Sequence, residues 1–171
     1  MDGGLISFLP RIVEERMVDR FDPFEGLVGG YASNAGTKSE LPLMVKTYVI
    51  SDYPTYRIHA YQRPGTAFYL LRELVGKQAF HKALKAYIQR WAKKHPTPYD
   101  FFYTFEDVLD RDLSWFWEPW FFDFGYPDLA LGDVQHSGSG NRVVIEKKGH
   151  MPVPVYLEVT YADGSKEVME R

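Results

Sequence analysis

The hydrophobic period of the sequence changes once, at Pro127, and this change constrains the fold most. Before Pro127, apolar residues recur at spacings of three and four, which is typical of amphipathic helices. Beyond it, apolar and polar residues alternate from Val143 to Tyr161, and the turn-forming stretches SGSGN and ADGS separate the runs. The sequence therefore predicts a mainly α fold: a helical part, residues 1–127, followed by an antiparallel β segment, residues 128–171.

Five helices are expected in the helical part. The first runs from Leu5 to about Arg20, and its apolar stripe is Ile6, Leu9, Val13 and Met17. Glycines and prolines between Phe21 and about Ala60 predict a long ordered loop that carries short pieces of regular structure. A second helix starts at Pro64 and ends at Gly76, and a third carries the stripe Phe80, Leu84, Tyr87, Ile88 and Trp91.

The last two helices of this part have clear start signals. Thr97 and Asp100 form a capping box in TPYD, with Pro98 at the first helical position. Asp112 precedes the aromatic stretch LSWFWEPWFFDFG, in which Pro119 should bend the helix because it lacks a backbone N–H. We expect the aromatic side chains of this stretch to form core and domain-interface contacts and not a ligand cage.

The β segment is expected to hold four short strands with one apolar face, arranged as one small sheet. This is too few strands for a closed sandwich, so the segment is interpreted as the start of a β-sandwich-like, incomplete β domain. Exposed strands or exposed aromatic surface would then favour a homo-oligomer.

Composition excludes several classes of function. The net charge is −3 and Lys and Arg are scattered, so a nucleic acid partner is not expected. No apolar run approaches the ~20 residues of a membrane span, and no signal sequence is visible, so we expect a soluble chain of unknown compartment. Without cysteine, any metal site would need His and carboxylate side chains.

Motifs for common active sites are absent from the sequence. None of the five histidines belongs to an H-E-x-x-H motif, and there is no G-x-S-x-G, P-loop or G-x-G-x-x-G motif. Tyr61 is a candidate, because Pro64 places it just before a helix, where its phenol could donate a hydrogen bond to a developing oxyanion. On spacing alone, simple packing of Tyr61 on the helix start is the favoured alternative.

Four stretches in order resemble the C-terminal part of the zinc aminopeptidases of the thermolysin-like gluzincin group. They are YQRPGTAFYLLRELVG, LVGKQAF, HPTPYDFFYTFEDV and DLSWFWEPWFFDFGYPDL. The resemblance covers nearly the whole chain. It implies the helical C-terminal half of a thermolysin-like catalytic domain that leads into a β domain, with zinc and peptide substrates in the parent family.

The resemblance also implies roles for two positions. Tyr61 falls where the family keeps the tyrosine that hydrogen-bonds the tetrahedral intermediate, although Pro64 replaces a glycine that is frequent there. The stretch MDGGLISF resembles the segment that supplies the third zinc ligand, a glutamate, and Gly3 occupies that ligand position. The histidine ligands and the general base would lie before Met1, in an N-terminal peptidase segment. We therefore expect this chain to bind no catalytic zinc and to hydrolyse no peptide by itself.

Three interpretations remain open at this point. The chain is a fragment of a zinc aminopeptidase, a non-catalytic relative kept as a helical binding or assembly module, or a helical scaffold of other ancestry. Coding sequence upstream of Met1 separates the first two, since it would contain H-E-x-x-H or replaced histidines. A fold in which Tyr61 and Gly3 lie far apart would favour the third.

Overall fold

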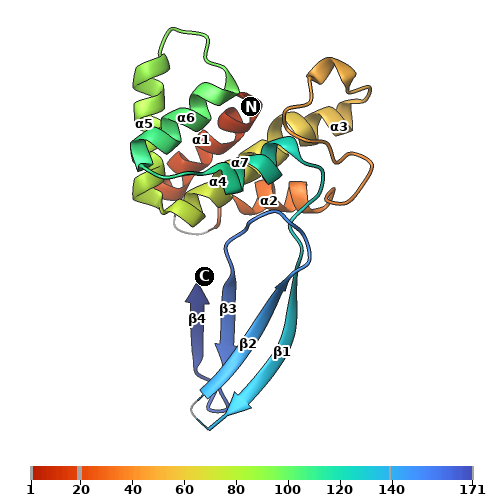
Figure 1. Ribbon diagram of the computed structural model, residues 1–171, viewed down its shortest axis with the longest axis vertical. Coiled ribbons are helices and arrows are strands. Elements are labelled where there is room, and N and C mark those ends of the chain that lie inside the picture. Colours follow the sequence, from red (N-terminus) through yellow and green to blue (C-terminus); the bar gives the residue numbers. More distant parts are fainter. Residues whose placement is uncertain (1, 19–20, 139, 171) are drawn as a thin grey trace.

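The computed structural model describes residues 2–18, 21–138 and 140–170, and in it a group of helices is followed by two strand pairs (Figure 1). The mainly α fold is thus confirmed. The α-helices are α1 (Asp2–Met17), α2 (Glu25–Ala32), α3 (Tyr53–Arg57), α4 (Arg63–Val75), α5 (Lys77–Trp91), α6 (Pro98–Leu109) and α7 (Ser114–Trp117). Shorter helical turns are η1 (Thr47–Val49), η2 (Ile58–Gln62) and η3 (Glu118–Phe122). The strands are β1 (Leu129–Ser137), β2 (Gly140–Lys147), β3 (Tyr156–Thr160) and β4 (Lys166–Glu170).

Helix α1 buries a different face from the expected one. Its buried residues are Gly4, Phe8 and Ile12, whereas three residues of the expected stripe are 67%, 55% and 78% exposed, namely Ile6, Val13 and Met17. Phe8 contacts the rings of Phe24, Phe68 and Phe80. The expected stripe is wrong because the large Phe8 beside the small Gly4 fixes which face meets α4, and periodicity alone could not choose between these faces.

The short pieces of structure expected between Phe21 and Ala60 are helical: α2, η1, α3 and the start of η2. Helix α2 forms despite three glycines because Leu27 and Tyr31, one turn apart, are both buried. Gly30 is needed for close packing, since a Cβ there would lie 2.6 Å from Nε2 of Gln62. Helix α3 begins where the backbone N–H of Thr55 donates to the Asp52 carboxylate at 2.8 Å.

Pro64 lies in the first turn of α4, as expected, but helical backbone already precedes it. Helical backbone continues from α3 through the π-helical turn η2 into α4, and Tyr61 lies inside this turn. A wider π-helical turn before a proline relieves the clash between its ring and the preceding turn. Pro119 is also associated with a π-helical turn, because it is the second residue of η3, where a bend was expected.

Aromatic side chains form most of the core, as expected. Phe101 stacks on Phe105 with 4.3 Å between ring centroids, and Trp117 stacks on Phe102 at 4.7 Å. The capping box of α6 is confirmed, and Gly76, with a positive φ of 90°, separates α4 from α5. Within the aromatic stretch of α7 and η3, the buried residues are Phe116, Trp117, Trp120 and Phe121.

The four strands form two antiparallel pairs, β1 with β2 and β3 with β4, and not the single expected sheet. The segment between β2 and β3 contains Pro152 and Pro154, which lack the backbone N–H that a continuous ladder needs. The same segment anchors the strands to the helices: Met151 is buried, and the Trp120 indole N–H donates to the Pro152 carbonyl at 2.9 Å. Among the described residues, no helix has the length and apolar character needed to cross a membrane.

Candidate functional site

Tyr61 and Gly3 lie directly beside each other. A Cβ built on Gly3 would be 2.9 Å from two carbons of the Tyr61 ring and 2.4 Å from the Ala60 carbonyl oxygen. The first turn of α1 therefore rests on the π-helical turn η2 with no room for a side chain at position 3. A large distance between Tyr61 and Gly3 would have favoured a scaffold of other ancestry, and the structure shows the opposite.

Tyr56 is the nearest polar partner of Tyr61. Their hydroxyl oxygens are 3.5 Å apart, and their rings meet edge to face with centroids 5.8 Å apart. The hydrogen bond between the two hydroxyls raises the pKa of Tyr61, so the Tyr61 phenol is protonated at neutral pH and can act as a donor. The sequence did not point to Tyr56, since residues five apart share a face only where the helix widens into a π-helical turn.

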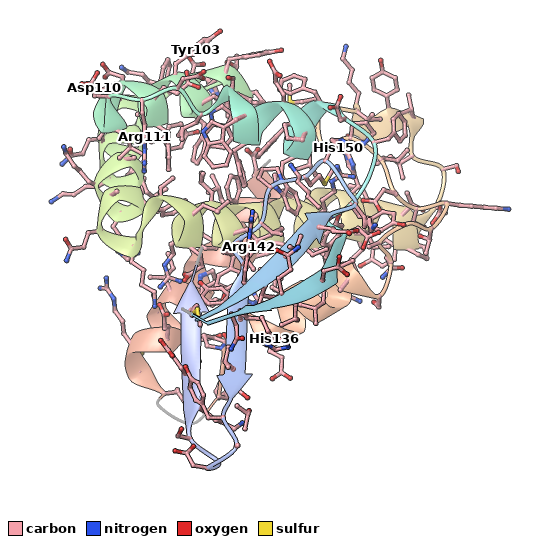
Figure 2. The ribbon with its side chains drawn as sticks, turned by 60° about the horizontal axis from the view of Figure 1, so that its bottom comes forward. Tyr103, Asp110, Arg111, His136, Arg142 and His150 are labelled. Carbon is pink, nitrogen blue, oxygen red and sulfur yellow. The ribbon has the colours of Figure 1, made fainter. Side chains whose placement is uncertain are left out.

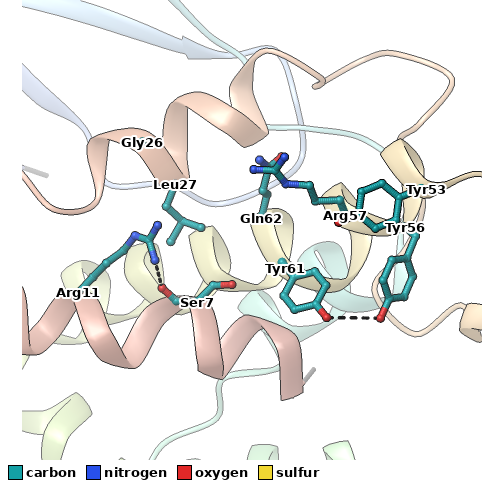
Figure 3. A pocket seen from close by; sticks show the side chains of 9 residues that line it. All are labelled: Ser7, Arg11, Gly26, Leu27, Tyr53, Tyr56, Arg57, Tyr61 and Gln62. Atoms are coloured by element: carbon teal, nitrogen blue, oxygen red, sulfur yellow. Dashed lines mark hydrogen bonds between the residues drawn. The ribbon is translucent and has the colours of Figure 1, made fainter.

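A pocket of about 360 Å³ opens between α1, the start of α2, α3 and η2 (Figure 3). Its lining residues are Ser7, Arg11, Gly26, Leu27, Tyr53, Tyr56, Arg57, Tyr61 and Gln62. Two of the nine carry a positive charge, and none is Asp or Glu. Tyr61 thus packs against the first turn of α1 and also lines a concave surface that carries two cationic side chains.

Arg63 holds the segment around this pocket in place. Its guanidinium is 1% exposed and donates to the Glu40 carboxylate at 2.9 Å and to the Leu41 carbonyl at 2.8 Å. It also donates to the carbonyls of Trp120 and Asp123, at 3.3 and 3.0 Å. Arg63 therefore joins three segments: residues 40–41, the helix that carries Tyr61, and the end of η3.

Burial sets the ionisation of the groups around Arg63. Burial lowers the pKa of Arg63, and the nearby Glu40 and Tyr31 oppose this effect. The Tyr31 hydroxyl donates to Glu40 at 3.0 Å, and burial raises the pKa of Tyr31 well above its usual range. The stretch YQRPGTAFYLLRELVG contains Arg63, but nothing in the sequence pairs it with Glu40, which lies 23 residues earlier in the chain.

The described residues do not fit a zinc ion. No group of three or more His, Asp or Glu side chains converges anywhere in the described ranges. Figure 2 shows His136 along the β1–β2 hairpin and His150 at its end near the helices. His59 is buried, with Nε2 3.1 Å from the Val45 carbonyl oxygen, and burial lowers its pKa. Gly3 offers no side-chain ligand atom.

Comparison with known proteins identifies the family of this chain. The profile of the Peptidase family M1 domain matches residues 31–120, which include Tyr56, Tyr61 and Arg63. The chain is 23% identical over 126 residues to aminopeptidase N of Haemophilus influenzae, covering 67% of this chain and 14% of that protein. The chain thus spans only a small part of the length of this relative. On the extent of the domain match, the chain belongs to peptidase family M1, the zinc aminopeptidases of the gluzincin group.

Proposed function

We propose that this chain forms the tyrosine side of an aminopeptidase site and hydrolyses no peptide bond by itself. The observation that carries the proposal is the contact between Gly3 and the Tyr61 ring. By the family resemblance, these positions belong to a zinc ligand and to the residue that stabilises the oxyanion. Position 61 keeps its functional side chain, whereas position 3 has none.

Tyr61 would act as a hydrogen-bond donor to the oxyanion that develops when a peptide carbonyl is attacked. The raised pKa of Tyr61 supports this role, because a phenol donates only while it is protonated. Tyr56 would position the phenol through its hydroxyl and its edge-to-face ring contact. The attack itself requires a nucleophile and a base that the described residues do not provide.

Two histories are compatible with this proposal. The chain is a fragment that works with an N-terminal peptidase segment, or it is a degenerate relative that has lost metal chemistry. An in-frame H-E-x-x-H in the coding sequence upstream of Met1 supports the fragment, and replaced histidines support the degenerate relative.

The alternative is a non-catalytic helical binding or assembly module. The cationic pocket favours it, because a pocket lined by two arginines and three tyrosines can bind a ligand without any metal. Exposed aromatic residues such as Tyr103 and exposed strand residues such as Leu131 would supply contacts for a homo-oligomer.

Turnover of a fluorogenic aminoacyl amide tests the proposal. The wild-type chain and the Tyr61→Phe variant, both with added zinc, should release the fluorophore at the rate of buffer alone. Circular dichroism first establishes that both are folded. Turnover that disappears in Tyr61→Phe but persists in a Tyr103→Phe control would contradict the proposal, since it would show a complete active site.

A further inference from the structure

We propose that the pocket beside Tyr61 binds the carboxylate of a short peptide, with Arg57 as its main contact and Arg11 as a second cation. The inference rests on the proposed function, because it names the ligand class for the same pocket. It adds a selectivity for acidic ligands that neither the domain match nor the aminopeptidase relative provides.

The charge of the pocket is unbalanced. Arg57 extends from α3 and Arg11 from α1, and none of the nine lining residues is acidic. Three arginines elsewhere in the chain have carboxylate partners: Arg63 pairs with Glu40, Arg72 with Glu15 and Arg90 with Asp107. Two guanidinium groups at one pocket without a counter-charge favour an anionic ligand.

The hydrogen-bonding capacity of these two arginines is largely unused. Arg57 is exposed, and its guanidinium makes no hydrogen bond or ion pair with any residue that the structure describes, which leaves its five N–H donors available to a ligand. Arg11 donates one Nη1 hydrogen to the Ser7 carbonyl, and its buried Nε has no partner within the described residues (Figure 3). A carboxylate accepts two parallel hydrogen bonds from such a group, which gives both strength and orientation.

The remaining lining favours an organic ligand over a small inorganic anion. The pocket volume of about 360 Å³ falls at the lower end of the ~300–1,000 Å³ typical of small-ligand pockets. Tyr53 and Tyr56 supply aromatic surface that an isolated anion would leave uncovered. A peptide carboxylate would satisfy the arginines while its neighbouring atoms cover these side chains.

Binding of capped peptides to the whole chain tests the inference by isothermal titration calorimetry. N-acetyl-Ala-Ala with a free carboxylate and N-acetyl-Ala-Glu-amide distinguish a terminal from a side-chain carboxylate. N-acetyl-Ala-Gln-amide and inorganic phosphate are the comparison ligands. At least one carboxylate peptide should bind about tenfold more tightly than the neutral peptide and than phosphate.

Matched variants locate the site. Arg57→Gln should weaken carboxylate binding about tenfold, whereas Arg16→Gln, which removes an exposed arginine from α1 outside the pocket, should leave it within about twofold. Equal binding of neutral and acidic peptides, tighter binding of phosphate, no binding at all, or an unchanged affinity in Arg57→Gln would each overturn the inference. Because the capped peptides have no free amino terminus, these outcomes are independent of whether the chain shows aminopeptidase turnover.

Discussion

Replacing Arg63 by Met is expected to destabilise the protein by about 3–5 kcal/mol. The guanidinium donates four hydrogen bonds, to Glu40, Leu41, Trp120 and Asp123. Methionine keeps much of the side-chain volume, so most of the loss comes from the polar contacts. The Glu40 carboxylate, 7% exposed, would keep its bond from Tyr31 but lose its only cationic partner among the described residues.

The magnitude can be measured as the free energy of unfolding in urea, followed by tryptophan fluorescence. Arg90→Met is the matched control, because its pair with Asp107 is 47% and 63% exposed and should contribute less than about 1 kcal/mol. The double variant Arg63→Met/Glu40→Gln should lose less unfolding free energy than the two single variants lose together, by at least about 1 kcal/mol. A loss below about 1 kcal/mol in Arg63→Met, or strict additivity with Glu40→Gln, would refute this account of the buried pair.

Three further predictions concern the same region. Gly3→Ala should lower the free energy of unfolding in urea by about 1–3 kcal/mol, because its Cβ would lie 2.4 Å from the Ala60 carbonyl oxygen. Gly29→Ala is the control and should not destabilise the protein, because its Cβ meets nothing within 4 Å. Equal stability of the two variants would contradict this reasoning. Tyr56→Phe should lower the pKa of Tyr61 toward its ordinary value, which ¹³C-labelled tyrosine NMR can follow; an unchanged titration would exclude the hydrogen bond. The lowered pKa of His59 means that the unfolded chain binds this proton more readily, so stability should fall as the pH drops below about 6.5. His59→Gln should flatten this part of the curve of melting temperature against pH, and an identical curve would argue against it.

Local signals predicted the elements whose start or end depends on neighbouring residues. The capping box of Thr97 and Asp100 and the glycine at position 76 were predicted because they act within one helical turn. The buried face of α1 was not, since Ile6 and Phe8 are both apolar and only contacts with distant aromatic rings decide which one is buried.

The candidate site depended more on resemblance and on tertiary contacts. The roles of Tyr61 and Gly3 were proposed from a family resemblance. The position of Tyr61 just before α4 was predicted, but the π-helical turn that contains it was not. Neither Tyr56 nor Glu40 could be found from periodicity. Tyr56 meets Tyr61 only because the helix widens into a π-helical turn, and Glu40 contacts Arg63 from 23 residues away in the chain.

Zinc binding at equilibrium tests the central claim most directly, namely that the chain keeps the tyrosine side of a peptidase site without the metal side. The folded wild-type chain is dialysed against micromolar free zinc at neutral pH, and bound metal is counted per chain by mass spectrometry. Since Gly3 carries no ligand side chain and the described residues form no group of three His, Asp or Glu, we predict well below one equivalent of bound zinc per chain. One full equivalent of zinc, retained after dialysis into zinc-free buffer, would contradict the account.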